Sequence, residues 1–175
     1  MVRELLARIP RMRLAVSATT RAQRPGEVNG LHYWFVTDEE FDRRLAAGDF
    51  IEYHVFPWGQ RSGTLRSELA RIGAEGGVPL LELETEGALL VKEEVAGAVT
   101  IFISAPVAEL ERRLRERATE STGEIEERIE IARMQLEQAG EFDYVIENDD
   151  LERAVDELTT LVRGLLSPAA TMPRR

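Results

Sequence analysis

The sequence predicts an α/β fold in which helices pack against a parallel sheet. Two observations predict it: short apolar runs of strand length alternate with segments of helical apolar spacing, and the run 98–104 is apolar almost throughout. Such a run is typical of a parallel strand that is buried on both faces. We therefore expect a layered fold that binds ligands beyond the carboxyl ends of its strands. With 175 residues, one domain is expected.

The outer parts of the chain supply the expected sheet and its helices. Strands are predicted over residues 14–17, 78–84, 98–104 and 144–147. Helices are predicted over residues 5–9, 64–76, 104–117, 125–136 and 150–162. The last residues, 167–175, are expected to form a flexible tail.

An inserted, mainly β segment is predicted in the first half of the chain. Residues 31–36 and 50–56 are aromatic, β-branched runs of strand length. Between them, Thr37 and Glu40 have the spacing of a capping box, and Gly48 marks the end of the helix that they begin. The aromatic strands therefore form a subdomain of their own.

The charge of the chain limits its partners. It has 22 Lys and Arg against 32 Asp and Glu, a formal net charge of −10, so its field repels a nucleic-acid polymer. It has no cysteine, which excludes disulfides and thiolate chemistry and suits the cytoplasm. No apolar stretch reaches the roughly 20 residues of a membrane span, so no membrane partner is expected. Any anionic ligand must be small and held locally.

Arginines after the first predicted strand are candidates for holding a phosphate. Arg21 and Arg24 lie three residues apart in a polar loop, and Tyr33 could add a hydroxyl. The planar guanidinium binds phosphate oxygens in pairs. An ordinary solvated loop is the alternative, and the spacing alone favours it.

Carboxylates at strand positions are the second group of candidates. Glu52 lies within the run 50–56, where a carboxylate could accept two parallel N–H bonds from a base. Strand alternation alone favours an outward-facing Glu52. Glu82 and Glu84 follow an apolar strand, where acidic groups of metal-phosphate sites are found, and a surface position is equally consistent.

A third group of arginines flanks the polar break at residues 119–123. Arg113, Arg117 and Arg128 could line a helical lid over a phosphoryl group, or each could be an exposed helix residue. The phosphate-binding motif G-x-x-x-x-G-K-[ST] is absent from the sequence. The sole lysine, Lys92, lies in a helical stretch and cannot fill the role of the motif's lysine.

Several short motifs, taken together, resemble the guanylate kinase family. They are Ser17-Ala-Thr-Thr-Arg21, Arg24-Pro-Gly-Glu-Val-Asn-Gly30, Tyr33, Phe50-Ile-Glu52, Ser62-Gly63-Thr64, Arg112-Arg113-Leu114, Arg117, Thr119-Glu120-Ser121 and Asn148-Asp149-Asp150-Leu151. They occur in family order between about residues 3 and 165. Each motif is weak alone, but the set is specific.

The resemblance implies a P-loop nucleoside monophosphate kinase fold: a parallel sheet with helices on both faces, an inserted GMP-binding subdomain over 25–65 and a lid over 113–128. In the family, ATP phosphorylates GMP to GDP with Mg²⁺, in purine nucleotide metabolism. The roles that the resemblance implies fall into four groups. Arg21, Arg24 and Tyr33 hold the GMP phosphate; Ser17, Glu52 and Thr64 bind guanine, and Glu82 also belongs to the GMP-binding set; Arg113, Arg117 and Arg128 neutralise the transferring group; Asn148 lies near adenine.

The sequence also departs from the family pattern. The first core strand and the P-loop are absent, so we expect an N-terminally truncated, inactive enzyme whose remaining strands lack a neighbour. Ser62 replaces a tyrosine, for which Arg61 could substitute, and Glu84 and Glu86 replace an aspartate and a glutamine. The alternative hypothesis is a catalytically dead module that binds GMP or a protein. A third is a kinase acting on another monophosphate.

Overall fold

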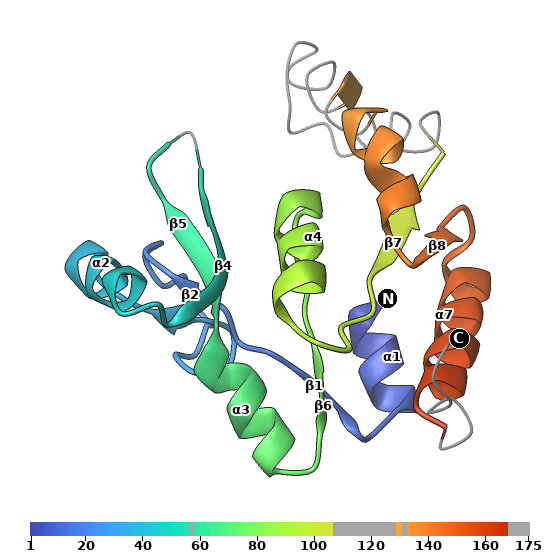
Figure 1. The fold of residues 1–175 in the computed structure, drawn as a ribbon, viewed down its shortest axis with the longest axis horizontal. Helices are drawn as coiled ribbons and strands as arrows, with labels where there is room; N and C mark the ends of the chain where they lie inside the picture. Colours follow the sequence, from blue (N-terminus) through green and yellow to red (C-terminus); the bar gives the residue numbers. More distant parts are fainter. Residues whose placement is uncertain (57, 107–128, 131–132, 168–175) are drawn as a thin grey trace. The chain divides into compact units, whose positions relative to one another are not determined.

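The computed structural model describes residues 1–56, 58–106, 129–130 and 133–167. The chain forms two compact units, one over Pro10–Ala98 and the other over Met1–Ile9 with Val99–Arg175 (Figure 1). Arg113, Arg117 and Arg128, and the whole predicted lid, lie outside the described residues. Within the described part of the chain, no helix is long and apolar enough to cross a membrane.

The unit Pro10–Ala98 contains two sheets. Strand β1 (Met12–Leu14) pairs in parallel with β6 (Val78–Leu80), as expected for an α/β fold. A four-stranded sheet has the order β3-β2-β5-β4. Its strands are β2 (Ala18–Thr19), β3 (Trp34–Phe35), β4 (Phe50–Val55) and β5 (Arg61–Leu65). This second sheet is the mainly β insertion that the aromatic runs predict.

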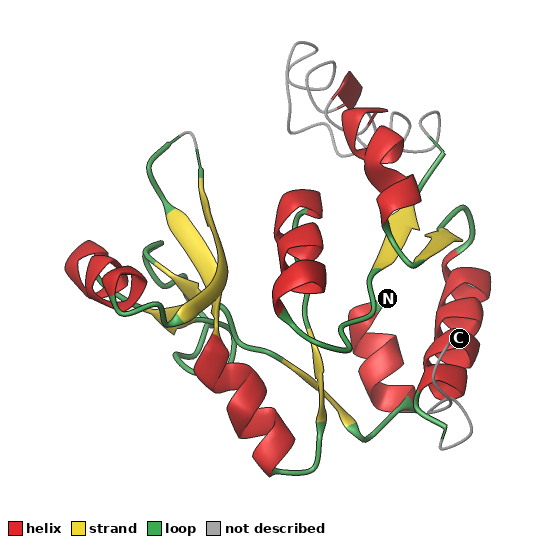
Figure 2. Cartoon of the chain, in the orientation of Figure 1, coloured by secondary structure: helices red, strands yellow, loops and turns green. Residues whose placement is uncertain are grey.

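Three helices belong to the same unit (Figure 2). They are α2 (Asp38–Ala46), α3 (Arg66–Ala74) and α4 (Thr85–Glu94). The predicted cap of α2 is confirmed, because Thr37 Oγ1 accepts a hydrogen bond from the Glu40 amide at 3.2 Å. The carboxylate of Glu40 pairs with Arg43 and Arg44 instead of completing the capping box.

The core of the four-stranded sheet is aromatic. Phe41 of α2 is fully buried and stacks on Phe50 of β4, with ring centroids 4.4 Å apart. Ala18 and Leu65 complete the buried cluster. The Arg61 guanidinium lies 4.7 Å from the Phe41 ring centroid, which is within cation–π range. This packing fixes α2 on the sheet.

The second unit is built on a parallel strand pair. Strand β7 (Ile101–Ser104) pairs with β8 (Tyr144–Glu147). The unit also contains α1 (Val2–Arg8), the 3₁₀ helix η1 (Gln138–Glu141) and α7 (Leu151–Leu165), and residues 129–130 and 133–137 are helical. Asp150 caps α7 by accepting from the Arg153 amide at 2.9 Å, at the start of the helix predicted over residues 150–162. Among the described residues, β6 pairs only with β1 and β7 only with β8. Each of these strands therefore keeps one open edge.

Several predicted strands are shorter, shifted or new in the structure. The strand expected over 78–84 ends at Leu80, that over 98–104 begins at Ile101, and only Trp34–Phe35 of the run 31–36 is a strand. The strand expected over 14–17 lies at Met12–Leu14, because its ladder partner β6 ends at Leu80. Residues 61–65 form β5, whereas Thr64 was expected to begin a helix. The segment Arg-Ser-Gly-Thr has low strand propensity, so only its pairing with β2 and β4 makes it a strand.

Strands β4 and β5 lie so close at Gly63 that a side chain has no room there. A Cβ at Gly63 would lie 2.7 Å from the Glu52 carbonyl oxygen and 2.8 Å from the Phe50 ring. We predict that Gly63→Ala lowers the free energy of unfolding by about 1–3 kcal/mol through overpacking. Urea unfolding measures it. The matched control is Gly73→Ala in α3, whose Cβ meets nothing within 4 Å. It should stabilise by about 0.4–1 kcal/mol, and a loss as large as that of Gly63→Ala would contradict the explanation.

Candidate nucleotide-binding site

A cavity of about 320 Å³ lies within the unit Pro10–Ala98. Strand β4 and the residues that follow it form one wall, and the segments before β2 and β3 and after β6 form the others. Its lining residues are Ser17, Tyr33, Glu52, Tyr53, His54, Phe56, Ser62, Glu82, Leu83, Glu84, Glu86 and Gly87. Four predicted binding residues, Ser17, Tyr33, Glu52 and Glu82, therefore come together at one cavity.

Glu52 is the most buried carboxylate of this cavity. Its residue is 7% exposed, and no hydrogen bond from the described residues reaches its carboxylate. A Cβ on Gly87, in the first turn of α4, would lie 3.0 Å from Glu52 Oε2, so a glycine there lets the helix approach the carboxylate. The sequence alternation that favoured an outward-facing Glu52 is thus overridden by packing against α4. A carboxylate held in this way lacks donors, and a ligand can supply them.

Thr64 lies beside Glu52 but not on the cavity wall. The two residues are register partners in the β4–β5 ladder, and Thr64 is 1% exposed. It is not one of the residues that line the cavity. Its predicted contact with a base stays a prediction.

The cavity is strongly acidic. Glu82, Glu84 and Glu86 line it together with Glu52. Among the described residues, no three His, Cys, Asp or Glu side chains are grouped in a way that could hold a metal ion. The carboxylates therefore suit a ligand that donates several hydrogen bonds.

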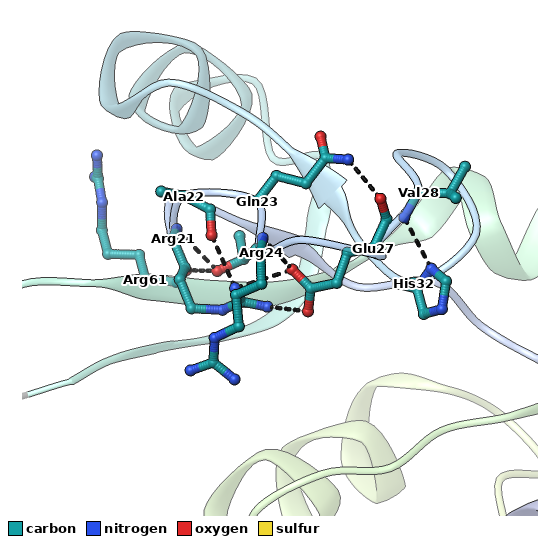
Figure 3. A network of polar contacts seen from close by, with 9 residues as sticks. Arg21, Ala22, Gln23, Arg24, Glu27, Val28, His32 and Arg61 are labelled. Atoms are coloured by element: carbon teal, nitrogen blue, oxygen red, sulfur yellow. Dashed lines mark hydrogen bonds and ion pairs between the residues drawn. The ribbon is translucent and has the colours of Figure 1, made fainter.

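Arg21 forms a preorganised cationic group beside Tyr33. Its guanidinium donates to both oxygens of Glu27, at 3.0 and 2.7 Å (Figure 3). It also lies 5.3 Å from the Tyr33 ring centroid. This hydrogen bonding raises the pKa of Arg21 above its ordinary value. The same hydrogen bond, with a second from the Arg24 amide, lowers the pKa of Glu27 from 4.5 to about 2. The position of Arg21 is thus fixed before any ligand arrives.

Arg24 is held by its backbone and not by its side chain. Its amide donates to Glu27 Oε2 at 2.7 Å, and its carbonyl accepts from the Glu27 amide at 3.1 Å. Gly26 closes this turn with a φ of 86°. The Arg24 guanidinium is exposed and points away from Glu27 (Figure 3). An anion can reach it there, and its contact with a phosphate stays a prediction.

Arg61 does not take the place of the family's tyrosine. Its guanidinium pairs with Asp38 at 2.7 Å and also with Asp42, both of α2. Ser62 lines the cavity, and its hydroxyl donates to the Ala18 carbonyl at 3.2 Å. The expected replacement of one phosphate contact by Arg61 is therefore absent from this arrangement.

Asn148 belongs to the other unit. It directly follows β8, and its amide donates to the Ser104 carbonyl at 2.7 Å. Its predicted place near adenine stays a prediction. The roles of Arg113, Arg117 and Arg128 also stay predictions, because these residues lie outside the described part of the chain.

Several site residues were not predicted from the sequence. Tyr53, His54 and Phe56 line the cavity. His54 and Phe56 follow Glu52 at alternate positions, so strand alternation could have found them. Glu27 acts within its own loop and lies in the motif Arg24-Pro-Gly-Glu-Val-Asn-Gly30, but no role was predicted for it. Gly87 acts through a contact with the distant Glu52, and no local signal marks it.

Comparison with known proteins identifies the family. The guanylate kinase family model matches residues 1–165. The guanylate kinase of Symbiobacterium thermophilum is 41% identical over 161 residues, covering 91% of this chain and 76% of that protein. The guanylate kinase of Synechococcus sp. strain CC9311 is 43% identical, covering 90% and 83%. The crystal structure of guanylate kinase from Anaplasma phagocytophilum aligns with a TM-score of 0.73 at 30% identity, covering 95% of this chain and 81% of that one.

The parallel strand pairs, the mainly β insertion and the acidic cavity beside Arg21 define an α/β protein of the nucleotide-binding class. The extent of the family match then makes the assignment specific. The chain belongs to the guanylate kinase family.

The Arg21–Glu27 pair predicts a low titration midpoint. Because the pKa of Glu27 is lowered to about 2, the pair should stabilise the loop at pH values above 4.5 and lose this contribution as the pH falls through about 2. Carboxyl ¹³C NMR measures the midpoint. Arg21→Gln should move it upward toward 4.5, without reaching it because the Arg24 amide still donates. Arg43→Gln, on α2, serves as the control. A midpoint near 4.5 in the parent chain would disprove the pairing.

Proposed function

We propose that the chain is a guanylate kinase, which transfers the γ-phosphoryl group of ATP to GMP and gives GDP and ADP. One observation carries the proposal: Glu52, a buried carboxylate to which no described residue donates, lines a cavity that also includes Tyr33, and the fixed guanidinium of Arg21 lies against the Tyr33 ring. GMP combines the two features that this arrangement complements. Its base offers two adjacent N–H donors, and its phosphate is anionic.

The acceptor nucleotide is assigned residue by residue. Glu52 accepts from the guanine N–H groups, with Ser17 and Glu82 lining the same cavity and Thr64 beside Glu52 in the ladder. Arg21, Arg24 and the Tyr33 hydroxyl hold the phosphate. The assignment of the base is supported by the cavity that Ser17, Glu52 and Glu82 share. The assignment of the phosphate is supported by the stacking of Arg21 over Tyr33. The acidic lining also disfavours a phosphate deep in the cavity, which orients the nucleotide base-first.

The donor side is assigned from the family. ATP supplies the phosphoryl group: a GMP phosphate oxygen bonds to the γ-phosphorus as the bond to the ADP oxygen breaks. Arg113, Arg117 and Arg128 neutralise the transferring group, and Asn148 lies near adenine. Mg²⁺ is implied too, but the described residues offer no protein cluster for a metal. We assign it no residue.

A second candidate function is a GMP-binding or interaction module without catalysis. The absence of G-x-x-x-x-G-K-[ST] from these 175 residues favours it, and so do Ser62 and the engagement of Arg61 by α2. The two candidates agree on GMP binding and differ on turnover. We further propose that the protein acts in the cytoplasm.

The Glu52 carboxylate provides the test of GMP binding. Glu52→Gln places an amide donor against a guanine donor, and Glu52→Ala leaves both guanine protons unpaired. Either change should weaken GMP binding by about 2–4 kcal/mol while leaving AMP binding unchanged or improved.

Calorimetry with GMP and AMP, on proteins shown to be folded by circular dichroism, measures the difference. Glu93→Gln is the matched control, because Glu93 is an exposed residue of α4 outside the cavity. Equal GMP affinity in the parent, Glu52→Gln and Glu93→Gln proteins would overturn the assignment of the base.

Turnover separates the two candidate functions. We predict that these 175 residues alone form no GDP from ATP and GMP, since they lack the backbone-amide cradle and the lysine that bind the β- and γ-phosphates. A coupled assay for ADP and GDP measures this. Adding a strand followed by G-x-x-x-x-G-K-[ST] ahead of Met1 should restore turnover if the chain is a kinase. Continued inactivity of a folded extended chain would favour the module, and turnover by the 175 residues would refute the prediction.

A further inference from the structure

Glu68 is a buried carboxylate outside the cavity that joins three segments of the unit Pro10–Ala98. It lies on α3 and is 3% exposed. Its Oε2 accepts from the Val16 amide at 3.0 Å, and its Oε1 accepts from the Trp34 indole N–H at 3.2 Å. Arg71, one turn further along α3, donates to both oxygens, at 3.0 and 3.2 Å. The carboxylate is therefore fully engaged.

The burial of Glu68 has a cost that these contacts offset. Burial raises the pKa of Glu68, but the hydrogen bonds from Arg71, Val16 and Trp34 outweigh it, and the pKa lies below its ordinary value. Two of the three donors belong to segments far from α3 in the sequence. The charged form is thus stabilised by contacts that also fix those segments.

The two segments held by Glu68 both lead into the cavity. Val16 precedes Ser17, Trp34 follows Tyr33, and Ser17 and Tyr33 line the cavity. The Trp34 amide also donates to the Ser17 carbonyl at 2.9 Å, so the segments are joined to each other next to the point where Glu68 holds them. A change in the position of the Trp34 indole would therefore reach Tyr33 directly.

The Trp34 indole has little freedom to move by itself. It packs against Gly30, where a Cβ would lie 2.9 Å from the ring and where φ is 78°. The Gly30 amide donates to the Tyr33 carbonyl at 2.8 Å. The indole therefore packs against Gly30 through its ring and donates its N–H to the Glu68 carboxylate.

We propose that Glu68 is a positioning residue for the acceptor nucleotide, which sets the places of Ser17 and Tyr33 on the cavity wall without touching the ligand. The inference rests on the proposed function for its ligand, GMP. A glutamine cannot replace the carboxylate, because one of its two terminal atoms is a donor that would face the Val16 amide or the Trp34 indole.

The experiment compares Glu68→Gln with Glu40→Gln. Glu40 is likewise a helix carboxylate paired with arginine, through Arg43 and Arg44, but it lies on α2 and outside the cavity, so it is a control for the loss of ion pairs. Calorimetry should show GMP affinity reduced about tenfold in Glu68→Gln and unchanged within about twofold in Glu40→Gln. Trp34→Phe, which removes only the indole donor, should give a smaller loss and serves if Glu68→Gln does not fold.

A double-mutant cycle with Tyr33→Phe separates positioning from general stability. If Glu68 acts through Tyr33, the loss caused by Glu68→Gln, or by Trp34→Phe, should shrink about threefold or more in the Tyr33→Phe background. Additive losses would mean that Glu68 does not act through Tyr33; additive losses in the same cycle with Ser17→Ala as well would overturn the proposal.

Amide NMR of the ligand-free chain tests, without GMP, whether Glu68 sets the positions of Ser17 and Tyr33. The Ser17 and Tyr33 resonances should shift in Glu68→Gln or Trp34→Phe and remain in place in Glu40→Gln. Unmoved Ser17 and Tyr33 resonances would overturn the positioning role even if GMP binds. If the parent chain does not bind GMP, the proposed function is overturned. The inference about Glu68 then falls with it, because the positioning role is defined by that ligand. Shifted resonances would in that case show only that Glu68 shapes the cavity wall.

Discussion

The antiparallel pairing of β4 with β5 is the constraint on which the candidate site depends. It places Glu52 opposite Thr64 and Tyr53 opposite Gly63. The close approach at Gly63 leaves no room for a side chain between the Glu52 carbonyl and the Phe50 ring. With that approach fixed, Phe50 reaches Phe41, α2 is anchored, and the Glu52 side chain meets α4 at Gly87. The most buried carboxylate of the cavity is therefore a product of backbone packing.

The site has acidic side chains along the cavity and a cationic side chain, Arg21, beside it. Four glutamates line the cavity, while the guanidinium of Arg21 is held by Glu27 and the rings of Tyr33 and Phe35. An isolated cation or anion satisfies only one of these two groups. A ligand with a donor-rich planar end and an anionic end satisfies both, and it also has to enter in one orientation. The electrostatics thus provide selectivity that neither group has alone.

Local signals in the sequence predicted some elements well. Thr37, Gly48 and Asp150 mark helix ends through contacts within a few residues, and the structure confirms the ends at Thr37 and Asp150 by hydrogen bonds. The short strand β5 was not predicted, because its strand character comes from its neighbours. The burial of Glu52 has the same origin. Alternation along β4 favours an outward-facing Glu52, because it cannot show that a helix beginning at Thr85 covers that face. Long-range packing therefore decides the burial of Glu52.

Recognition of the acceptor and donation of the phosphoryl group have different structural requirements in this chain. Every described residue proposed for GMP lies in the unit Pro10–Ala98, where its neighbours are fixed by contacts within that unit. Asn148 belongs to the other unit. If the proposed roles hold, binding of GMP rests on residues of one unit, whereas transfer also rests on residues of the other. The described residues that line the cavity all belong to the unit Pro10–Ala98. A change on the donor side that leaves this unit folded is therefore expected to affect transfer before recognition.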